Sequence, residues 1–334
     1  MAAVRTVLGD IAAGDLGRTD YHEHLFQVTP LLAGDELDDQ ARSGAEAAML
    51  CGSGFAAMVE ATPTALGRNA AGIARISAAT GLHVVATSGA HREAHYGPGH
   101  WLLKLTEAQL GARFTHDVEV GIPGIDEPDS GDLALAPNGV PIRAGMLKAG
   151  IGYWSVTPFE RRVLAGVAEA HDRTGAPVMV HLEHGSAAIE VLGILVSDGV
   201  APDAVVLAHV DRNPDPGLHA ELAAAGAYLG YDCFARTRTW PDQVILDSLL
   251  RAAALGATDR LLLGGDVARR TRYVAYGGLP GLRYLGDRVV PRFVKSGGAE
   301  LVEAVLVTNP ARLLGRFGVS PAPKANSIAS SDIA

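Results

Sequence analysis

Cysteine is scarce in this sequence: the 334 residues include only two, Cys51 and Cys233. This excludes a disulfide-rich scaffold and indicates a reducing compartment, so we expect a cytoplasmic protein. No apolar run reaches the length of about 18 residues that a membrane-spanning helix needs, so no membrane partner is expected. Residues 1–20 carry acids and glycines without a long apolar core, so they do not resemble a signal peptide.

Basic residues are also few, with 28 Lys and Arg against 37 Asp and Glu, a net charge of −9. This balance argues against a general nucleic-acid binder, which needs a basic face. Aromatic residues make up only 5% of the chain, so the core must be built mainly from Ala, Val, Leu and Ile. The length fits one large α/β barrel or two medium domains.

Short apolar segments alternate with longer amphipathic segments along the chain. The apolar segments predict eight strands, at residues 18–25, 55–62, 82–89, 142–152, 177–184, 204–211, 227–234 and 261–268. The amphipathic segments include predicted helices at residues 69–80, 157–175, 185–199 and 308–318. Strands that alternate with helices pair in parallel through helical crossovers. We therefore expect a single-domain α/β fold, a (β/α)₈ TIM barrel over residues 1–319.

An open doubly wound sheet is the alternative fold, but no G-X-G-X-X-G motif follows an early strand. Two stretches near residues 90–141 and 267–290 interrupt the alternation and are expected to form insertions at the barrel mouth. The small polar tail at 320–334 is predicted to be disordered. Helix starts are predicted at Thr157, followed by Pro158, and at Asn309 as an N-cap before Pro310.

Six polar residues occur on or at the ends of predicted strands. His22 and His24 share one face of a strand because they are two residues apart. A parallel barrel brings the carboxyl ends of all strands to one rim, so the six side chains should converge. Each one alone has a simpler explanation, such as a hydrogen-bonded rim histidine or a lysine paired with a carboxylate. The candidates are His22, His24, Lys148, His181, His209 and Asp266.

Imidazole and carboxylate ligands suit Zn²⁺ and its divalent neighbours, whereas a lysine ammonium would repel a cation. The whole pattern resembles the phosphotriesterase family of the amidohydrolase superfamily, whose members are metal-dependent hydrolases on this barrel. The resemblance implies that CO₂ carboxylates Lys148, which then bridges two divalent ions, with zinc first and manganese or cobalt as alternatives. It implies that His22, His24 and Asp266 hold one ion and that His181 and His209 hold the other. A hydroxide that bridges the ions would attack the substrate, and Asp266 would accept the released proton.

The loops at residues 207–216, 231–241 and 264–285 are similar to the phospho-furanose lactonase branch of that family. This implies opening of a sugar 1,4-lactone, with a substrate phosphate bound by Tyr96, by Arg236 or Arg238, and by Arg269. Two features depart from the branch: arginines replace the usual lysine after strand seven, and residues 277–281 read G-G-L-P-G. The arginines could instead form a solvated loop that pairs with surface acids.

The sequence supports three functional hypotheses. A lactonase for a small anionic lactone or ester is favoured, with an organophosphate triesterase or broad carboxylesterase as the alternative. A non-catalytic ligand-binding barrel would not need the carboxylated lysine. The sequence assigns no role to His91, His95 and His100, and it leaves a homodimer open.

Overall fold

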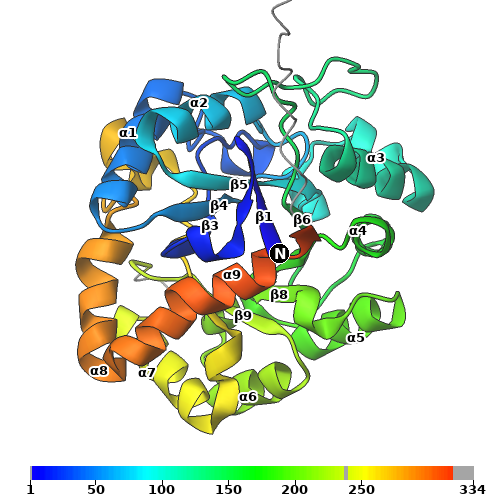
Figure 1. Cartoon of the computed structure of the whole chain (residues 1–334). Helices are drawn as coiled ribbons and strands as arrows, with labels where there is room; N and C mark the ends of the chain where they lie inside the picture. The colour runs from blue at the N-terminus through cyan, green and yellow to red at the C-terminus, as the bar shows by residue number, and fades with distance from the viewer. Residues whose placement is uncertain (1, 237–239, 319–334) are drawn as a thin grey trace, which may run out of the picture.

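Eight parallel strands form one sheet in the order β10-β9-β8-β7-β6-β5-β4-β3 in the computed structural model, which describes residues 2–236 and 240–318. Asp266 N donates to His22 O at 2.9 Å, which links the last strand segment to the first. The predicted TIM barrel is thus confirmed, and each predicted strand contains one observed strand (Figure 1). The strands are β3 (Thr19–Glu23), β4 (Ala57–Glu60), β5 (His83–Gly89), β6 (Met146–Ile151), β7 (Val178–Leu182), β8 (Val205–Ala208), β9 (Tyr228–Tyr231) and β10 (Leu261–Leu263).

Helices surround the barrel. The helix start predicted at Thr157 is confirmed. Thr157 Oγ1 accepts from Glu160 N at 3.2 Å and Glu160 Oε2 accepts from Thr157 N at 2.8 Å, so a capping box begins α4. The helices are α1 (Gln40–Gly52), α2 (Ala70–Thr80), α3 (Glu107–Glu119), α4 (Pro158–Thr174), α5 (Ala188–Ser197), α6 (Pro216–Ala224), α7 (Asp242–Ala252), α8 (Val290–Glu303) and α9 (Asn309–Leu314).

Two sequence-based expectations about helices need correction. The stretch at 90–141 is not only a mouth insertion, because it contains α3, the barrel helix between β5 and β6. Asn309 is not an N-cap: Thr308 before it already has helical φ and ψ of −68° and −47°. Asn309 instead donates through Nδ2 to the carbonyl oxygens of Thr258 and Leu261, at 2.8 and 2.9 Å. Its side chain therefore fixes the C-terminal helix against the start of β10.

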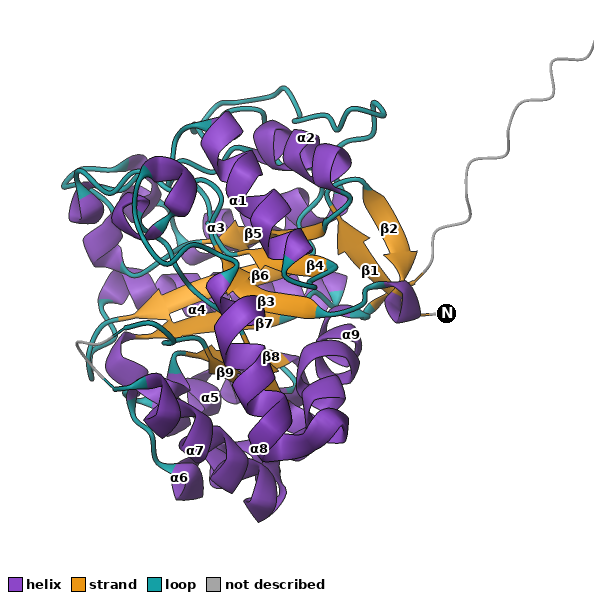
Figure 2. Cartoon of the chain, turned by 90° about the vertical axis from the view of Figure 1, so that its left-hand side faces the viewer, coloured by secondary structure: helices purple, strands orange, loops and turns teal. Residues whose placement is uncertain are grey.

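The two ends of the described chain meet in a small antiparallel sheet that the sequence did not predict. It contains β1 (Ala2–Thr6), β2 (Gly9–Ala12) and β11 (Phe317–Gly318), with Ala2 paired with Gly318. Val7 N donates to Val84 O at 2.9 Å near the start of β5, so this sheet covers the amino end of the barrel (Figure 2). The opposite end remains available for a site. The predicted tail at 320–334 lies outside the described residues.

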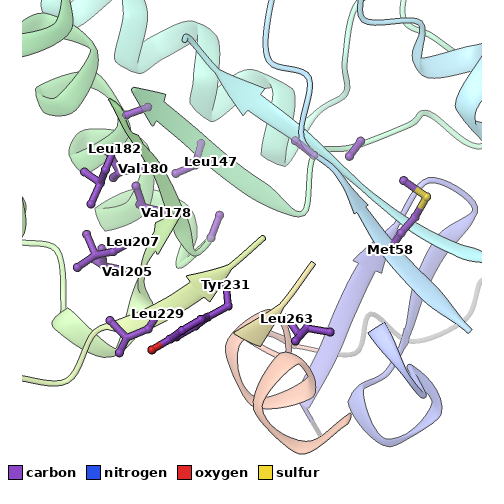
Figure 3. Close-up of a cluster of buried hydrophobic side chains, with 14 of the residues drawn as sticks. Met58, Leu147, Val178, Val180, Leu182, Val205, Leu207, Leu229, Tyr231 and Leu263 are labelled. Atoms are coloured by element: carbon purple, nitrogen blue, oxygen red, sulfur yellow. The ribbon is translucent and has the colours of Figure 1, made fainter. Parts of the chain in front are cut away.

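Side chains alternate between two hydrophobic clusters along the barrel strands. Val178 and Val180 on β7 face outward and belong to the cluster that also contains helix residues. Figure 3 shows these two side chains among other buried side chains of the strands. Met179 lies between them and packs with Met146 in the cluster inside the barrel. The next inward positions on β6 and β7 belong to Lys148 and His181, because successive residues of a strand face opposite sides. None of the described helices is both long and apolar enough to cross a membrane.

Candidate metal centre

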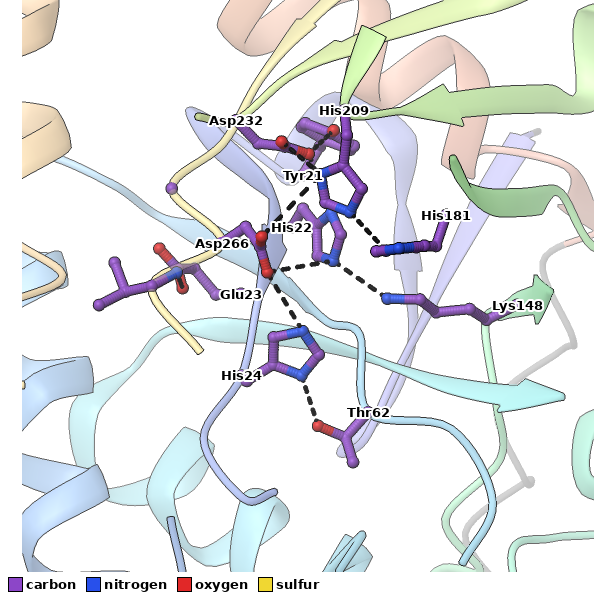
Figure 4. Close-up of polar contacts among 12 residues, drawn as sticks. Tyr21, His22, Glu23, His24, Thr62, Lys148, His181, His209, Asp232 and Asp266 are labelled. Atoms are coloured by element: carbon purple, nitrogen blue, oxygen red, sulfur yellow. Dashed lines mark hydrogen bonds and ion pairs between the residues drawn. The ribbon is translucent and has the colours of Figure 1, made fainter. Parts of the chain in front are cut away.

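All six predicted ligands lie together at the carboxyl end of the barrel and are buried (Figure 4). Lys148 and His181 reach the site because they continue the inward faces of β6 and β7. His209 and Asp266 follow β8 and β10 and have positive φ angles of 67° and 43°. Only a few per cent of non-glycine residues adopt this conformation, and Asp and His do so more often than most. These backbone angles direct both side chains to the rim.

The inner nitrogen and oxygen atoms of these residues face one another. Lys148 Nζ lies 3.0 Å from His22 Nε2, and His209 Nε2 lies 2.8 Å from His181 Nδ1. Asp266 Oδ1 lies 3.5 Å from His24 Nε2 and 3.8 Å from His22 Nε2. Ligand atoms of His22, His24 and Asp266 lie within 4.8 Å of one another, close enough to share one metal ion.

Asp232 is a functional residue that the sequence analysis missed. Its Oδ2 lies 3.1 Å from His22 Nδ1 and its Oδ1 lies 2.6 Å from His209 Nδ1. It also accepts a hydrogen bond from the Tyr21 hydroxyl. The available signal was its position directly after β9, where a carboxylate follows an apolar strand at the same rim. Asp232 orients one imidazole of each predicted metal pair.

The remaining two imidazoles have outer partners as well. His24 Nδ1 lies 2.7 Å from Thr62 Oγ1, and His181 Nε2 lies 2.9 Å from Glu183 Oε2. In each ring the outer nitrogen is engaged and the other nitrogen is directed at the centre. Metal-ligating histidines in proteins have this arrangement, because the outer hydrogen bond fixes the ring and its tautomer.

Burial sets the charge of the cluster. It lowers the pKa of His24 to about 4 and that of His209 to about 3, so both rings are neutral near pH 7. It also lowers the pKa of Lys148 to about 8. Burial alone would raise the pKa of Asp266, but the charge of Arg236 holds it well below the usual range. Neutral imidazoles beside an ionised carboxylate form a donor set that fits divalent cations.

A cavity of about 350 Å³ opens over the six residues. Arg236 lines it and donates to the main-chain and side-chain oxygens of Asp266. Arg269 lines it as well and pairs with Asp35 at 3.1 Å. Arg92 and Arg212, which the sequence analysis did not select, also contribute to the wall and follow β5 and β8. The mouth is therefore more basic than expected.

Tyr96 is not brought to the cavity wall. Its hydroxyl accepts from His91 N at 3.0 Å and donates to Thr64 O at 3.1 Å. Tyr96 therefore connects the loop after β5 to the loop after β4 and does not line the cavity. Arg238 lies outside the described residues. His91 lines the cavity together with His95, whereas His100 does not; its Nδ1 accepts from Leu102 N at 3.2 Å.

Known proteins are similar to this chain in sequence and in fold over almost their whole length. The model of the phosphotriesterase family matches residues 2–314. A phosphotriesterase homology protein of Mycobacterium tuberculosis is 32% identical, covering 95% of this chain and 99% of the relative. A phospho-furanose lactonase of Mycoplasmopsis synoviae is 27% identical, covering 93% and 91%.

The solved structure of a lactonase from Listeria monocytogenes is also similar. It superposes with a TM-score of 0.84 at 31% identity, covering 95% of this chain and all of that one. The barrel fold, the cluster of histidines and an aspartate at its carboxyl end, and the similarity to these relatives all indicate the same family. The chain is a hydrolase that belongs to the phosphotriesterase family.

Proposed function

We propose that this hydrolase is a lactonase that opens the 1,4-lactone of a small, anionic sugar acid. The observation that carries the proposal is the convergence of six ligand-type side chains under a cavity whose other charged groups are mainly arginines. Similarity to proteins named lactonase supports the same reaction class.

The residues divide into two sets of ligands. His22, His24 and Asp266 would hold one divalent ion, and His181 and His209 would hold the other. Zinc suits these nitrogen and oxygen ligands, and manganese or cobalt would be accepted by the same set. Two such cations would lower the pKa of a bound water molecule and would polarise the oxygen of the substrate carbonyl.

Lys148 is the proposed bridge between the sets after it reacts with CO₂. The Lys148 ammonium would first lose one proton. Its neutral Nζ would then form a bond to the carbon of CO₂ and lose a second proton, so the neutral amine becomes an anionic carbamate. Because burial lowers its pKa to about 8, roughly a tenth of Lys148 is neutral at pH 7. An exposed lysine would be neutral in only about one molecule in 2,500. The folded chain thereby favours the modification.

Asp266 is the proposed proton acceptor. It is ionised and buried, and its carboxylate lies between the imidazoles and Arg236. It can take the proton released from the attacking water and deliver it to the ring oxygen that leaves when the lactone opens. Arg236 donates to this carboxylate and would keep it oriented.

The charge of the cavity wall indicates an anionic substrate. The two carboxylates of the wall, Glu183 and Asp266, are already paired with protein cations or histidines. Arginine forms paired, charge-assisted hydrogen bonds with phosphate or carboxylate, whereas a neutral phosphotriester would gain little from it. The arginines of the wall are Arg92, Arg212, Arg236, Arg269 and Arg272. Arg238 remains a proposed contact from sequence alone.

A substrate screen of the zinc-loaded protein tests the proposal. A pH-indicator assay should detect hydrolysis of 1,4-aldonolactones, with 5-phosphorylated forms preferred, and little hydrolysis of a chromogenic phosphotriester. Lys148→Ala should lose activity and about half of the bound metal, and a short-chain carboxylic acid should restore part of the activity. Lys104→Ala, outside the cavity, is the matched control. Preference for the triester, or full activity in Lys148→Ala, would refute the proposal.

A further inference from the structure

Two histidines line the cavity without belonging to the proposed ligand set. His91 and His95 follow β5, are each only 5% exposed, and lie with ring centroids 3.8 Å apart. The His91 ring is also 4.5 Å from that of His181. Within the described part of the chain, no hydrogen bond is made by Nε2 of either residue. Both side chains therefore present a polar atom to the cavity next to the reaction centre.

The position of His91 is tightly defined. Gly150 on β6 leaves space for it, since a Cβ there would lie 3.2 Å from His91 Nδ1 and 2.9 Å from Arg92 N. The Tyr96 hydroxyl accepts from His91 N at 3.0 Å. This is the role that the structure gives to Tyr96.

The tautomer of His91 follows from its neighbour. Arg92 N can only donate, and it lies 2.8 Å from His91 Nδ1. Nδ1 must accept this hydrogen bond, so the proton of the neutral ring is on Nε2. His91 therefore offers a hydrogen-bond donor to the cavity.

His95 has the opposite tautomer. Thr29 Oγ1 has one proton and donates it to His95 O at 2.8 Å. The same oxygen lies 3.4 Å from His95 Nδ1 and can act there only as an acceptor. Nδ1 thus carries the proton, and Nε2 of His95 offers a lone pair to the cavity. Burial lowers the pKa of His95 to about 3, so its ring is neutral. The His91 ring is neutral because its Nδ1 accepts the hydrogen bond from Arg92 N.

A donor and an acceptor side by side match a hydroxyl group, which can accept one hydrogen bond and donate another. We infer that His91 and His95 form a binding site for one hydroxyl group of the substrate. The inference rests on the proposed lactonase function and names the two residues that would recognise one hydroxyl group of the sugar lactone. A phosphotriester or an unsubstituted lactone has no group that satisfies both atoms. Because the His91 ring lies beside that of His181, a hydroxyl group bound here would be close to the reacting carbonyl of the substrate.

Three lactones that differ by one hydroxyl test this site: γ-butyrolactone and its 2-hydroxy and 3-hydroxy derivatives. The native enzyme should prefer at least one hydroxylated lactone in kcat/KM by about 10- to 100-fold, the effect of two buried hydrogen bonds. His91→Phe and His95→Phe should abolish the preference, so that the ratio of kcat/KM for the hydroxylated lactone over γ-butyrolactone falls to about one. His100→Phe, in the same loop but outside the cavity wall, should retain the preference.

Thr29→Val provides a test that retains both imidazoles. It removes the acceptor for His95 Nδ1, together with the donor to His95 O and the acceptor for Leu31 N, so the tautomer of His95 is no longer fixed and the preference should fall. Circular dichroism checks the fold of every variant. Equal losses on all three lactones, or no preference in the native enzyme, would overturn the inference.

Binding of ring-opened products separates this inference from the proposed function. Calorimetric titration of 4-hydroxybutyrate against its 2-hydroxy and 3-hydroxy derivatives requires no turnover. Tighter binding of one hydroxylated acid, lost in His91→Phe, supports the hydroxyl site even if no lactone is hydrolysed. Failure of the native enzyme to hydrolyse any lactone refutes the proposed function alone, and equal binding of the acids refutes the hydroxyl site.

Discussion

Asp232 accepts a hydrogen bond from His209, with Oδ1 at 2.6 Å from Nδ1. The second oxygen of the carboxylate lies 3.1 Å from Nδ1 of His22. Burial opposes ionisation of Asp232, but the two imidazoles hold its pKa well below the usual range. One carboxylate therefore fixes the tautomer of a proposed ligand from each ion, and it links the two halves of the centre.

Asp232→Asn should weaken metal binding without removing any proposed ligand. An amide can donate to Nδ1 and then favours the tautomer whose Nε2 carries a proton and cannot bind a cation. Loss of such an outer partner costs about 10- to 100-fold in metal affinity. Competition with a chromophoric chelator measures the affinity, and Asp198→Asn, which pairs with Arg161 on the surface, is the control. Unchanged affinity would show that Asp232 has no orienting role.

The sequence predicted the eight strands and the converging ligands because both depend on local patterns. Apolar runs that end in a polar residue mark the barrel strands, and parallel topology brings their carboxyl ends together. Lys148 and His181 could be placed in this way from their own strands alone. The same reasoning could have selected Asp232, but the sequence does not distinguish a ligand from the residue that orients one.

Other features depend on contacts between distant residues. The pairing of Ala2 with Gly318 joins the two ends of the described chain, and no local signal marks it. Arg92 and Arg212 lie three and four residues beyond the ends of β5 and β8, but only the fold shows that they reach the cavity. The opposite tautomers of His91 and His95 require the positions of Arg92 N and Thr29 Oγ1. These are properties of tertiary structure rather than of any short motif.

Activation of the metal-free protein by CO₂ should depend on the pKa of Lys148. The amine reacts only when deprotonated, so its reactive fraction rises with pH and levels off above a pKa of about 8. At constant dissolved CO₂, the rate of activation before zinc addition should rise about tenfold from pH 6 to 7 and little above pH 9. A midpoint near the ordinary lysine pKa of about 10.4 would show that burial does not lower the pKa of Lys148.

Arg269→Ala should reduce hydrolysis of a phosphorylated lactone far more than that of its unphosphorylated analogue. Arg269 lines the cavity, and its pair with Asp35 holds it at the mouth. Loss of charge-assisted hydrogen bonds to phosphate should lower kcat/KM by about 10- to 100-fold. The analogue should lose less than about threefold. Arg283→Ala, which breaks a surface pair with Asp287, should affect neither substrate. Equal losses on both lactones would contradict phosphate binding by Arg269.

Arg68 should be essential for stability, because it is a buried cation with two carboxylate partners. It donates to Asp117 at 3.0 Å, to Asp126 at 3.0 Å and to Thr87 O at 2.9 Å. These contacts connect α3, the loop after it and β5. Arg68→Ala leaves Asp117 buried without its cation, which should lower the free energy of unfolding by about 3–5 kcal/mol.

Denaturant titration of the zinc-loaded protein measures the effect of Arg68→Ala. Arg161→Ala is the control, since it breaks an exposed pair with Asp198 and should cost about 0–1 kcal/mol. Arg68→Ala combined with Asp117→Ala should be more stable than Arg68→Ala alone, because the double variant no longer buries an unpaired charge. A loss below about 1 kcal/mol in the single variant would mean that water replaces the guanidinium and that the ion pairs do not hold α3 to the barrel.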